Sequence, residues 1–345
     1  MNSIVEFLKR REVLLGIVVL CMIAIIGSIN PNFLQIRNLI SVYNDTSILI
    51  ILALGQMLVI LTRCIDLSVA ANLALTGMVV GLLNAAFPGF PVEGLIVLAV
   101  LMGACLGAIN GAFVWLLGVP AIVVTLGTMS IYRGSIFLLS GGDWVNAHQM
   151  SPAFLAIPRQ LFLGVPVLSW MSLIVIALMV YITRFRPFGR QFFAAGGNPR
   201  AAFYTGINVG FVQFRAFVIS GALAGLCGYL WVSRYAVAYT EVANGFELQV
   251  VAACVIGGIS IMGGVGTVAG AFLGALFLGI ISNSLSIIGV SQFWQMAISG
   301  AVIIIAVIAN SRSEKKPGRI ILREAVAADA IDESARGDTR PATGQ

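Results

Sequence analysis

One acidic residue stands inside an otherwise apolar part of this chain. Asp66 follows Thr62-Arg63-Cys64-Ile65 and precedes a helical pattern. An acid within a membrane is a candidate proton or cation site. The Asp66 carboxylate is also well placed to cap the free backbone amides of the next helix, or to pair with Arg63. We favour capping or ion pairing, and the residues alone leave both interpretations open.

Other polar side chains are scattered through apolar stretches. Arg133 lies about two helical turns from the outer end of its stretch. We expect it to pair with a carboxylate or to reach outward, rather than to touch a solute. Asn110, Thr125 and Asn283 can either hydrogen-bond between helices or line a weakly polar path.

The sequence contains few residues that could support enzyme catalysis. There is one histidine, His148, and the five cysteines are scattered singly, so we predict no catalytic residues and no metal site. Residues 264–269 match a dinucleotide-binding pattern, but they join two apolar stretches rather than a strand and a helix. A phosphate-binding lysine motif is absent, because no lysine occurs between Lys9 and Lys315. Transport is therefore the expected function, without a cofactor in this chain.

The composition defines the class of protein. Hydrophobic residues make up 59% of the chain and charged residues 10%, and the mean hydropathy is +1.00. Soluble domains carry roughly 25% charged residues, so we predict an all-α polytopic membrane protein. The net charge is +6, but the basic residues cluster at the borders of apolar stretches. This pattern reflects orientation in the membrane, and nucleic acid is not an expected partner.

The apolar stretches predict about ten transmembrane helices. The two shortest, 47–62 and 248–262, are the candidates to tilt, break or re-enter the membrane. The predicted spans are 13–29, 47–62, 67–86, 94–117, 121–139, 167–183, 214–233, 248–262, 267–288 and 293–309. Residues 1–12 then form a cytoplasmic N-terminus, 13–310 the membrane domain, and 311–345 a flexible cytoplasmic tail.

The basic residues support this even number of spans. With both termini in the cytoplasm, 16 Lys and Arg residues fall on the cytoplasmic side and three on the outside. Such a bias is the usual sign of cytoplasmic loops. It places the multi-pass chain in a cell membrane with both ends inside.

The loop at 184–214 is the longest basic interval between spans. It carries Arg184, Arg186, Arg190 and Arg200, and it contains no acid. A short amphipathic segment in its middle predicts that a cytosolic partner docks there.

Glycines at one-turn spacing occur in several spans. They are Gly103, Gly107 and Gly111; Gly221 and Gly225; and Gly266, Gly270 and Gly274. Small residues at this spacing let helix backbones approach closely in lipid, so they predict a tightly packed bundle.

Four blocks of sequence resemble the signature blocks of ribose-type permeases. These permeases are the membrane subunits of bacterial ABC importers for pentoses, hexoses and the related autoinducer 2. The blocks occur in the expected order and cover about residues 45–310. They are Ile60–Val69, Pro120–Gly134, Ala195–Ala202 with Thr205–Asn208, and Val255–Thr267.

The resemblance implies partners for the chain. A cytosolic subunit would bind ATP and Mg, a periplasmic sugar-binding protein would deliver the solute, and a second copy or a related permease would complete the membrane part. The bacterial inner membrane is the implied location. The resemblance also implies that a coupling helix follows the sixth span. Carried over by position, it comprises Gly196, Gly197, Asn198, Pro199, Ala201, Ala202, Gly206 and Ile207.

Three residues, at two places in the chain, depart from the pattern of ribose-type permeases. Arg200 stands where related permeases commonly have Glu or Lys, which puts a specific charge pair with the ATPase in doubt. Arg63-Cys64 stands where two glycines are usual. The continuation from Asp66 to Gly77 is similar to permeases assigned to L-rhamnose, which suggests the rhamnose branch.

The function expected from the residues and the resemblance is import of a neutral monosaccharide by alternating access. The alternative is a secondary transporter or channel driven by an ion gradient, with Asp66 as the coupling carboxylate. An ion-coupled carrier would typically hold more acids within the membrane than this chain does.

Overall fold

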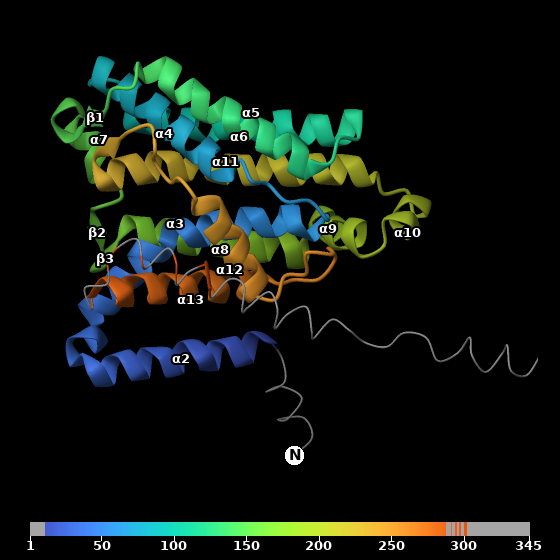
Figure 1. Ribbon diagram of the computed structural model, residues 1–345, viewed down its shortest axis with the longest axis horizontal. Coiled ribbons are helices and arrows are strands. Elements are labelled where there is room, and N and C mark those ends of the chain that lie inside the picture. The colour runs from blue at the N-terminus through green and yellow to red at the C-terminus, as the bar shows by residue number, and fades with distance from the viewer. Residues whose placement is uncertain (1–10, 288–290, 292–293, 295–296, 298–299, 302–345) are drawn as a thin grey trace, which may run out of the picture.

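The computed structural model describes residues 11–287 together with 291, 294, 297, 300 and 301. Within this part of the chain, eight helices are long and apolar enough to cross a membrane. They lie side by side along one direction (Figure 1). The eight are α2 (Arg11–Ile29), α3 (Ile36–Leu61), α4 (Val69–Ala86), α5 (Val92–Leu117), α6 (Ala121–Ser140), α8 (Val167–Phe185), α11 (Val209–Tyr235) and α13 (Val268–Ile287). The predicted all-α polytopic fold is confirmed.

Helix α3 lies at the centre of the bundle. Every residue from Thr46 to Leu61 is buried, and α3 contacts α8, α11, α12 and α13. A helix that is apolar on all sides belongs in such a core. By contrast, α5, α6 and α8 expose Leu, Ile and Val side chains on their outer faces. These faces suit contact with lipid, where apolar side chains carry no cost.

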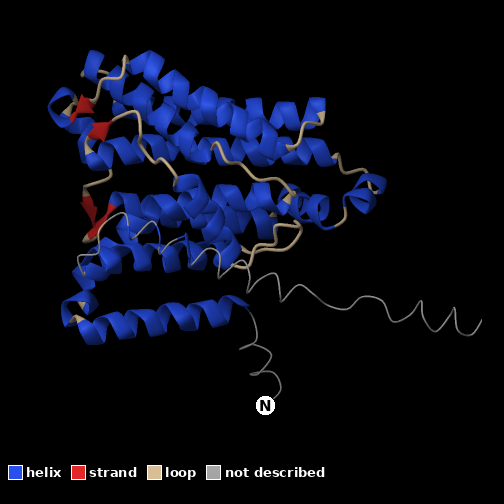
Figure 2. Cartoon of the chain, viewed as in Figure 1, coloured by secondary structure: helices blue, strands red, loops and turns tan. Residues whose placement is uncertain are grey.

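Short elements close the two ends of the bundle. One end, which we call the β1 end, holds η1 (Pro31–Leu34), η2 (Ala147–Gln149), α7 (Pro152–Ala156) and two strand pairs. Strand β1 (Val145–Asn146) pairs antiparallel with β4 (Val237–Ala238), and β2 (Leu161–Phe162) with β3 (Val165–Pro166) (Figure 2). The other end, the α10 end, holds α9 (Pro187–Gly197) and α10 (Pro199–Tyr204).

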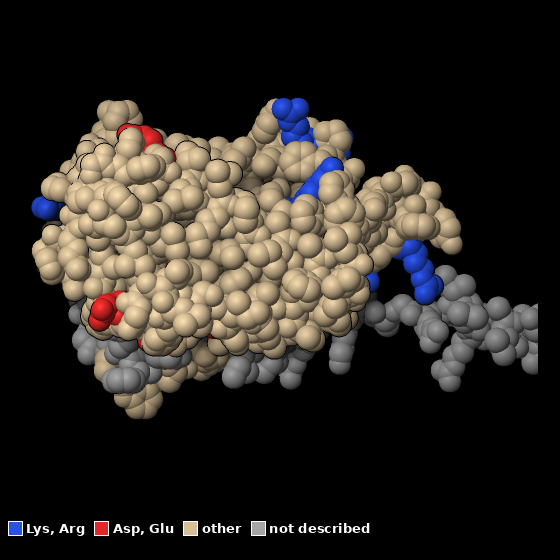
Figure 3. All heavy atoms as spheres, turned by 90° about the horizontal axis from the view of Figure 1, so that it is seen from above, with Lys and Arg blue, Asp and Glu red and all other residues tan. Residues whose placement is uncertain are grey.

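Charge is divided between the two ends. On the face seen in Figure 3, blue basic side chains gather mainly toward the α10 end, and red acidic side chains lie toward the β1 end. The middle of the bundle is uncharged on this face. This distribution is that of a protein whose middle lies in a bilayer and whose two ends face different compartments.

Glycines join α5 to α11. A Cβ added at Gly103 would overlap the carbonyl of Gly221, and one at Gly107 would overlap that of Phe217. A Cβ added at Gly225 would meet the carbonyl of Ala99. The two backbones therefore touch, as the one-turn glycine spacing predicted. These contacts lie within one chain.

Helix α12 (Phe246–Ile256) is shorter than the predicted span at 248–262. It ends at Ile256, and irregular backbone with positive φ at Gly258, Gly263 and Gly264 continues from Gly257 to α13. The predicted span at 47–62 is instead longer, because α3 begins at Ile36. The prediction of ten spans is not decided, since most of 293–309, like most of 1–12 and all of 311–345, lies outside the described residues.

Candidate functional site

The helical structure stops between α3 and α4, where the seven residues 62–68 form an irregular segment. Thr62 ends α3, and Arg63 adopts a left-handed conformation with φ of 65°. Few residues other than glycine adopt this conformation, so surrounding contacts must hold it. Irregular backbone at membrane depth is tolerated where it is buried in protein or lines a cavity. Both conditions are met around this interruption, which we call the α3–α4 break.

Asp66 lies in the α3–α4 break and is 2% exposed. Its Oδ1 accepts hydrogen bonds from the Ser68 amide at 2.9 Å and from the Ser68 hydroxyl at 2.7 Å. Ser68 directly precedes α4, so Asp66 fixes the residue at the start of this helix, while the amides inside its first turn receive no side-chain cap. The guanidinium of Arg63 is directed toward the end of α9.

Two further predicted residues converge on this point. Asn110 of α5 donates from Nδ2 to the Ser68 hydroxyl at 2.8 Å. Thr125 of α6 places its hydroxyl 3.4 Å from the carbonyl oxygen of Ile65. The α3–α4 break is thus joined by polar contacts to both α5 and α6.

Arg133 and Asn283 lie away from this cluster. Arg133 donates from Nη1 to the carbonyl of Val242 at 2.6 Å, near the β1 end. Asn283 donates to the carbonyl of Gly279 within its own helix, at 3.0 Å. The structure therefore brings three of the five predicted polar residues together and separates these two.

The predicted coupling residues lie at the end of α9, at the start and in the middle of α10, and in the turn that follows α10. The Asn198 side chain accepts from the Ala201 amide at 3.0 Å and caps α10, and Pro199 occupies its first turn. At the other end Gly206 has φ of 84°, and the Ile207 amide donates to the carbonyl of Ala202 at 3.0 Å. Helix α10 is therefore a short unit closed at both ends, and Ala202 and Ile207 hold it against the bundle.

Aromatic side chains project from α10. Phe203 is 69% exposed and Tyr204 is 85% exposed, and their rings are next to each other. Gly197, Asn198, Arg200 and Ala201 are exposed on the same unit. An exposed aromatic pair beyond the end of a membrane bundle suits contact with another protein.

Backbone contacts join the end of α9 to Leu61, the last residue of α3, and to the irregular segment at 257–267. The Gly264 amide donates to the carbonyl of Leu61 at 2.9 Å. A Cβ added at Gly196 would overlap that same carbonyl, and one at Gly264 would collide with Gly197. The three segments cross where only glycines fit.

Arg63 stabilises the crossing of these three segments, which we call the glycine crossing. Its Nε donates to the carbonyl of Gly196 at 2.6 Å, and its Nη2 donates to the carbonyl of Gly197 at 3.1 Å. These carbonyls are at the C-terminus of α9, where a cation is electrostatically favoured. Sequence reasoning missed this contact, which joins residues 133 positions apart; the only signal was a basic side chain beside the predicted break.

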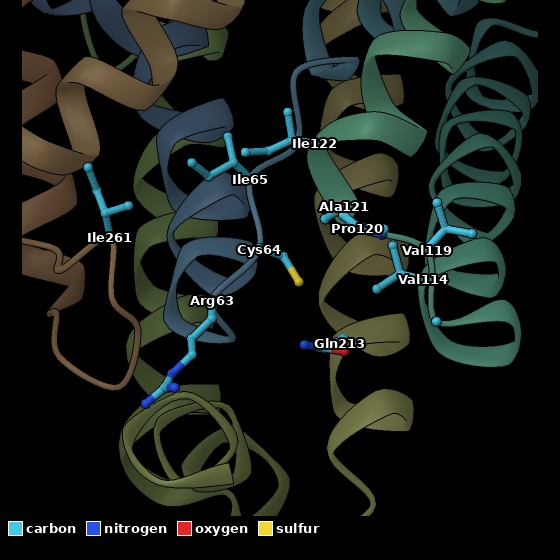
Figure 4. A pocket seen from close by; sticks show the side chains of 11 residues that line it. Arg63, Cys64, Ile65, Val114, Val119, Pro120, Ala121, Ile122, Gln213 and Ile261 are labelled. Atoms are coloured by element: carbon cyan, nitrogen blue, oxygen red, sulfur yellow. The ribbon is translucent and has the colours of Figure 1, made fainter.

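A cavity of about 480 Å³ opens beside the α3–α4 break. Its walls come from that break, the end of α5, the start of α6, Gln213 of α11 and Ile261. Figure 4 shows Cys64 and Gln213 directed toward the cavity, whereas Arg63 extends toward α9. Gln213 donates from Nε2 to the carbonyl of Thr62 at 3.1 Å. Sequence reasoning did not select Gln213 either.

Comparisons with known proteins agree with this architecture. Residues 38–307 match the family described as branched-chain amino acid transport system / permease component. The autoinducer 2 import system permease protein LsrC of Photorhabdus laumondii is 37% identical over 305 residues, which cover 88% of this chain and 90% of that protein. The LsrC proteins of Salmonella typhi and Shigella flexneri are each 34% identical over 304 residues, covering 88% of this chain and 86% and 88% of theirs. No solved structure matches the chain.

The bundle and these matches define a membrane permease of the ABC importer class. The chain belongs to the permease family that residues 38–307 match. It is a transport subunit rather than an enzyme, and its resemblance to the ribose-type group is confirmed. Membership of this family favours a permease subunit over the ion-gradient carrier considered from Asp66.

Proposed function

We propose that this chain is the permease subunit of an ATP-driven importer for a small neutral solute rich in hydroxyl groups. The single observation that carries the proposal is the exposed helix α10, connected through α9 and Arg63 to the α3–α4 break. Such a connection lets an event at one end of the bundle act on its interior.

The α10 end faces the cytosol in this proposal. The support is the concentration of basic side chains at that end, together with Arg184, Arg186, Arg190 and Arg200 in and around α9 and α10. The β1 end then faces the periplasm across a bacterial inner membrane, and both chain termini are cytoplasmic.

A cytosolic ATPase subunit docks on α10 and binds the ATP and Mg that this chain does not. A periplasmic binding protein delivers the solute to the β1 end, and a second copy or a related permease pairs with this chain in the membrane. The matched family of permease components supports partners of these kinds in general.

Motion of α10 would act on the bundle as a rigid unit. The caps at Asn198 and Gly206 keep α10 helical, and the glycine crossing transmits its displacement to Leu61 and Gly264. Two packed arrangements of this crossing would open the interior to one side at a time, which is alternating access.

A neutral polyol is the solute that fits best. The similar LsrC proteins are named for import of autoinducer 2, which the resemblance to ribose-type permeases groups with pentoses and hexoses. The cavity is lined by apolar groups, a thiol and an amide, and the guanidinium of Arg63 is directed out of it. Pentoses, hexoses and L-rhamnose belong to the same chemical class and are the other candidates.

The test is uptake into proteoliposomes that contain the permease, its ATPase and its binding protein. We expect ATP-dependent accumulation of autoinducer 2, D-ribose or L-rhamnose that an uncoupler of the proton gradient does not reduce. Uptake that collapses with the proton gradient and ignores ATP would contradict the proposal. Accumulation of leucine in place of the polyols would contradict the proposed solute class.

Changing Gly206 to valine is expected to weaken coupling. A β-branched residue at φ of 84° is strained by roughly 1–2 kcal/mol, and this strain loosens the end of α10 without a clash, since the space around Gly206 is open. Uptake per ATP hydrolysed should fall about threefold while membrane insertion is normal. Unchanged uptake would count against the coupling role of this segment.

Changing Asp66 to asparagine is expected to lower stability more than it alters solute choice. The amide oxygen can still accept from Ser68, but a hydrogen bond to a neutral acceptor is weaker by about 1 kcal/mol. Thermal unfolding of the purified complex should occur a few degrees earlier, with the ranking of solutes preserved. If Asp66→Asn has normal stability but its uptake no longer depends on an ion gradient, the ion-coupled alternative is supported instead.

A further inference from the structure

The cavity beside the α3–α4 break is lined by two interruptions of the helical bundle. One is the break itself, through Cys64 and Ile65, and the other is the irregular segment after α12, through Ile261. Non-helical backbone in a membrane protein marks buried or water-lined regions, and interrupted helices commonly form solute sites. Two interruptions that are about 200 residues apart in sequence meet at this one cavity.

The size and chemistry of the cavity suit a small neutral molecule. Pockets for small ligands typically have about 300–1,000 Å³, with apolar walls and a few polar groups, and this cavity has about 480 Å³. Val114, Val119 and Ile122 supply apolar walls, while the amide of Gln213 offers an oxygen that accepts from a hydroxyl.

Charge is kept out of the cavity by the contacts of Arg63. Arg63 lines the cavity, but its guanidinium extends away from Cys64 and Gln213 and donates to the carbonyls of Gly196 and Gly197. Asp66 is held by Ser68 and is not among the lining residues. An uncharged compartment disfavours ions, because a charge that leaves water without a partner loses its solvation.

We propose that this cavity is the compartment in which the neutral hydroxyl-bearing solute rests before its release from the α10 end. This inference rests on the proposed function for the direction of release. Because Arg63 belongs both to the cavity wall and to the contact with α9, displacement of α9 and α10 changes the shape of this compartment. Release of the solute is thereby coupled to movement of the ATPase subunit that binds α10.

The first test is chemical access to Cys64 in vesicles that expose the α10 end and contain the full complex. An uncharged, water-soluble methanethiosulfonate bearing a hydroxyethyl group is added, and peptide mass spectrometry reports each thiol. Cys64 is 5% exposed and lines the cavity, whereas Cys227 and Cys254 are 0% exposed, so we expect modification of Cys64 and none of the other two. Failure to modify Cys64 would show that no aqueous compartment reaches it and would overturn the proposal.

The second test fills the cavity and measures transport. Ala121 lines it, whereas Val123 of the same helix is 61% exposed on the outer face. Ala121→Trp should reduce ATP-dependent uptake of the transported polyol at least about tenfold, and Val123→Trp should leave it within about twofold. Equal uptake by the two variants would overturn the compartment. If the unaltered complex takes up no solute with ATP, the proposed function fails, and access to Cys64 still reports on the compartment.

Discussion

Replacing Gly196 by valine is expected to eliminate ATP-dependent uptake. A Cβ at this position would overlap the carbonyl of Leu61, and Leu61 also accepts the hydrogen bond from Gly264. Both neighbours are backbone, so they cannot move aside as a flexible side chain would. The end of α9 must separate from the α3–α4 break, and movement of α10 no longer reaches the interior. Uptake should fall by about a hundredfold or more, equivalent to roughly 3 kcal/mol or more in the transport barrier.

The neighbouring glycine provides the matched control. A Cβ added at Gly197 would meet only the Cα of Gly264, at 3.9 Å, which is an ordinary contact. Gly197→Ala should therefore transport within about twofold of the unaltered protein. Membrane level and co-purification with the ATPase are measured for both variants. Normal uptake by Gly196→Val would show that this crossing does not transmit movement.

Replacing Arg63 by glycine is expected to lower the amount of solute transported per ATP hydrolysed. Glycine adopts the φ of 65° without strain, so this variant removes the guanidinium while the backbone of the break is favoured. The carbonyls of Gly196 and Gly197 lose two charge-assisted hydrogen bonds, each worth about 1.5–3 kcal/mol when fully formed and less where solvent screens it. Solute taken up per ATP hydrolysed should decrease about tenfold.

Hydrolysis and uptake are measured together for Arg63→Gly in proteoliposomes. The control is Arg200→Ala, an exposed basic residue of α10, whose loss should affect docking at low salt more than the coupling ratio. An unchanged ratio of uptake to hydrolysis would contradict the role of Arg63 in coupling. If both rates also decline together, the role of Arg63 is purely structural.

The helices were largely predictable from the sequence because a bilayer demands long apolar stretches. The limits of prediction appear at α3 and α12. Because polar residues occur between Asn38 and Ser47, hydropathy placed the start of this span at residue 47. The structure instead begins α3 at Ile36 and continues the helix through these residues. Over 248–262 the composition is mostly apolar, but Gly257 and Gly258 allow the backbone to leave the helix. Hydropathy does not distinguish a buried irregular segment from a spanning helix.

The candidate site was only partly predictable. The resemblance indicated α10, and the isolated acid drew attention to Asp66. Asn110 and Thr125 were recognised as polar groups in apolar helices, but their convergence on Ser68 and Ile65 depends on how α4, α5 and α6 pack. The contact of Arg63 with Gly196 and the position of Gln213 at the cavity depend on long-range packing that no local pattern encodes.

The role of α10 as the docking element for the ATPase is tested most directly by crosslinking. A photoreactive amino acid replaces Tyr204, which is 85% exposed on α10, or Phe162, which is 59% exposed at the β1 end. Cells that also express the ATPase subunit and the binding protein are illuminated, and the crosslinked partner is identified by mass spectrometry. Our account predicts that the probe at 204 captures the ATPase subunit and that the probe at 162 does not. Capture of the ATPase from position 162, or of the periplasmic binding protein from position 204, would contradict it.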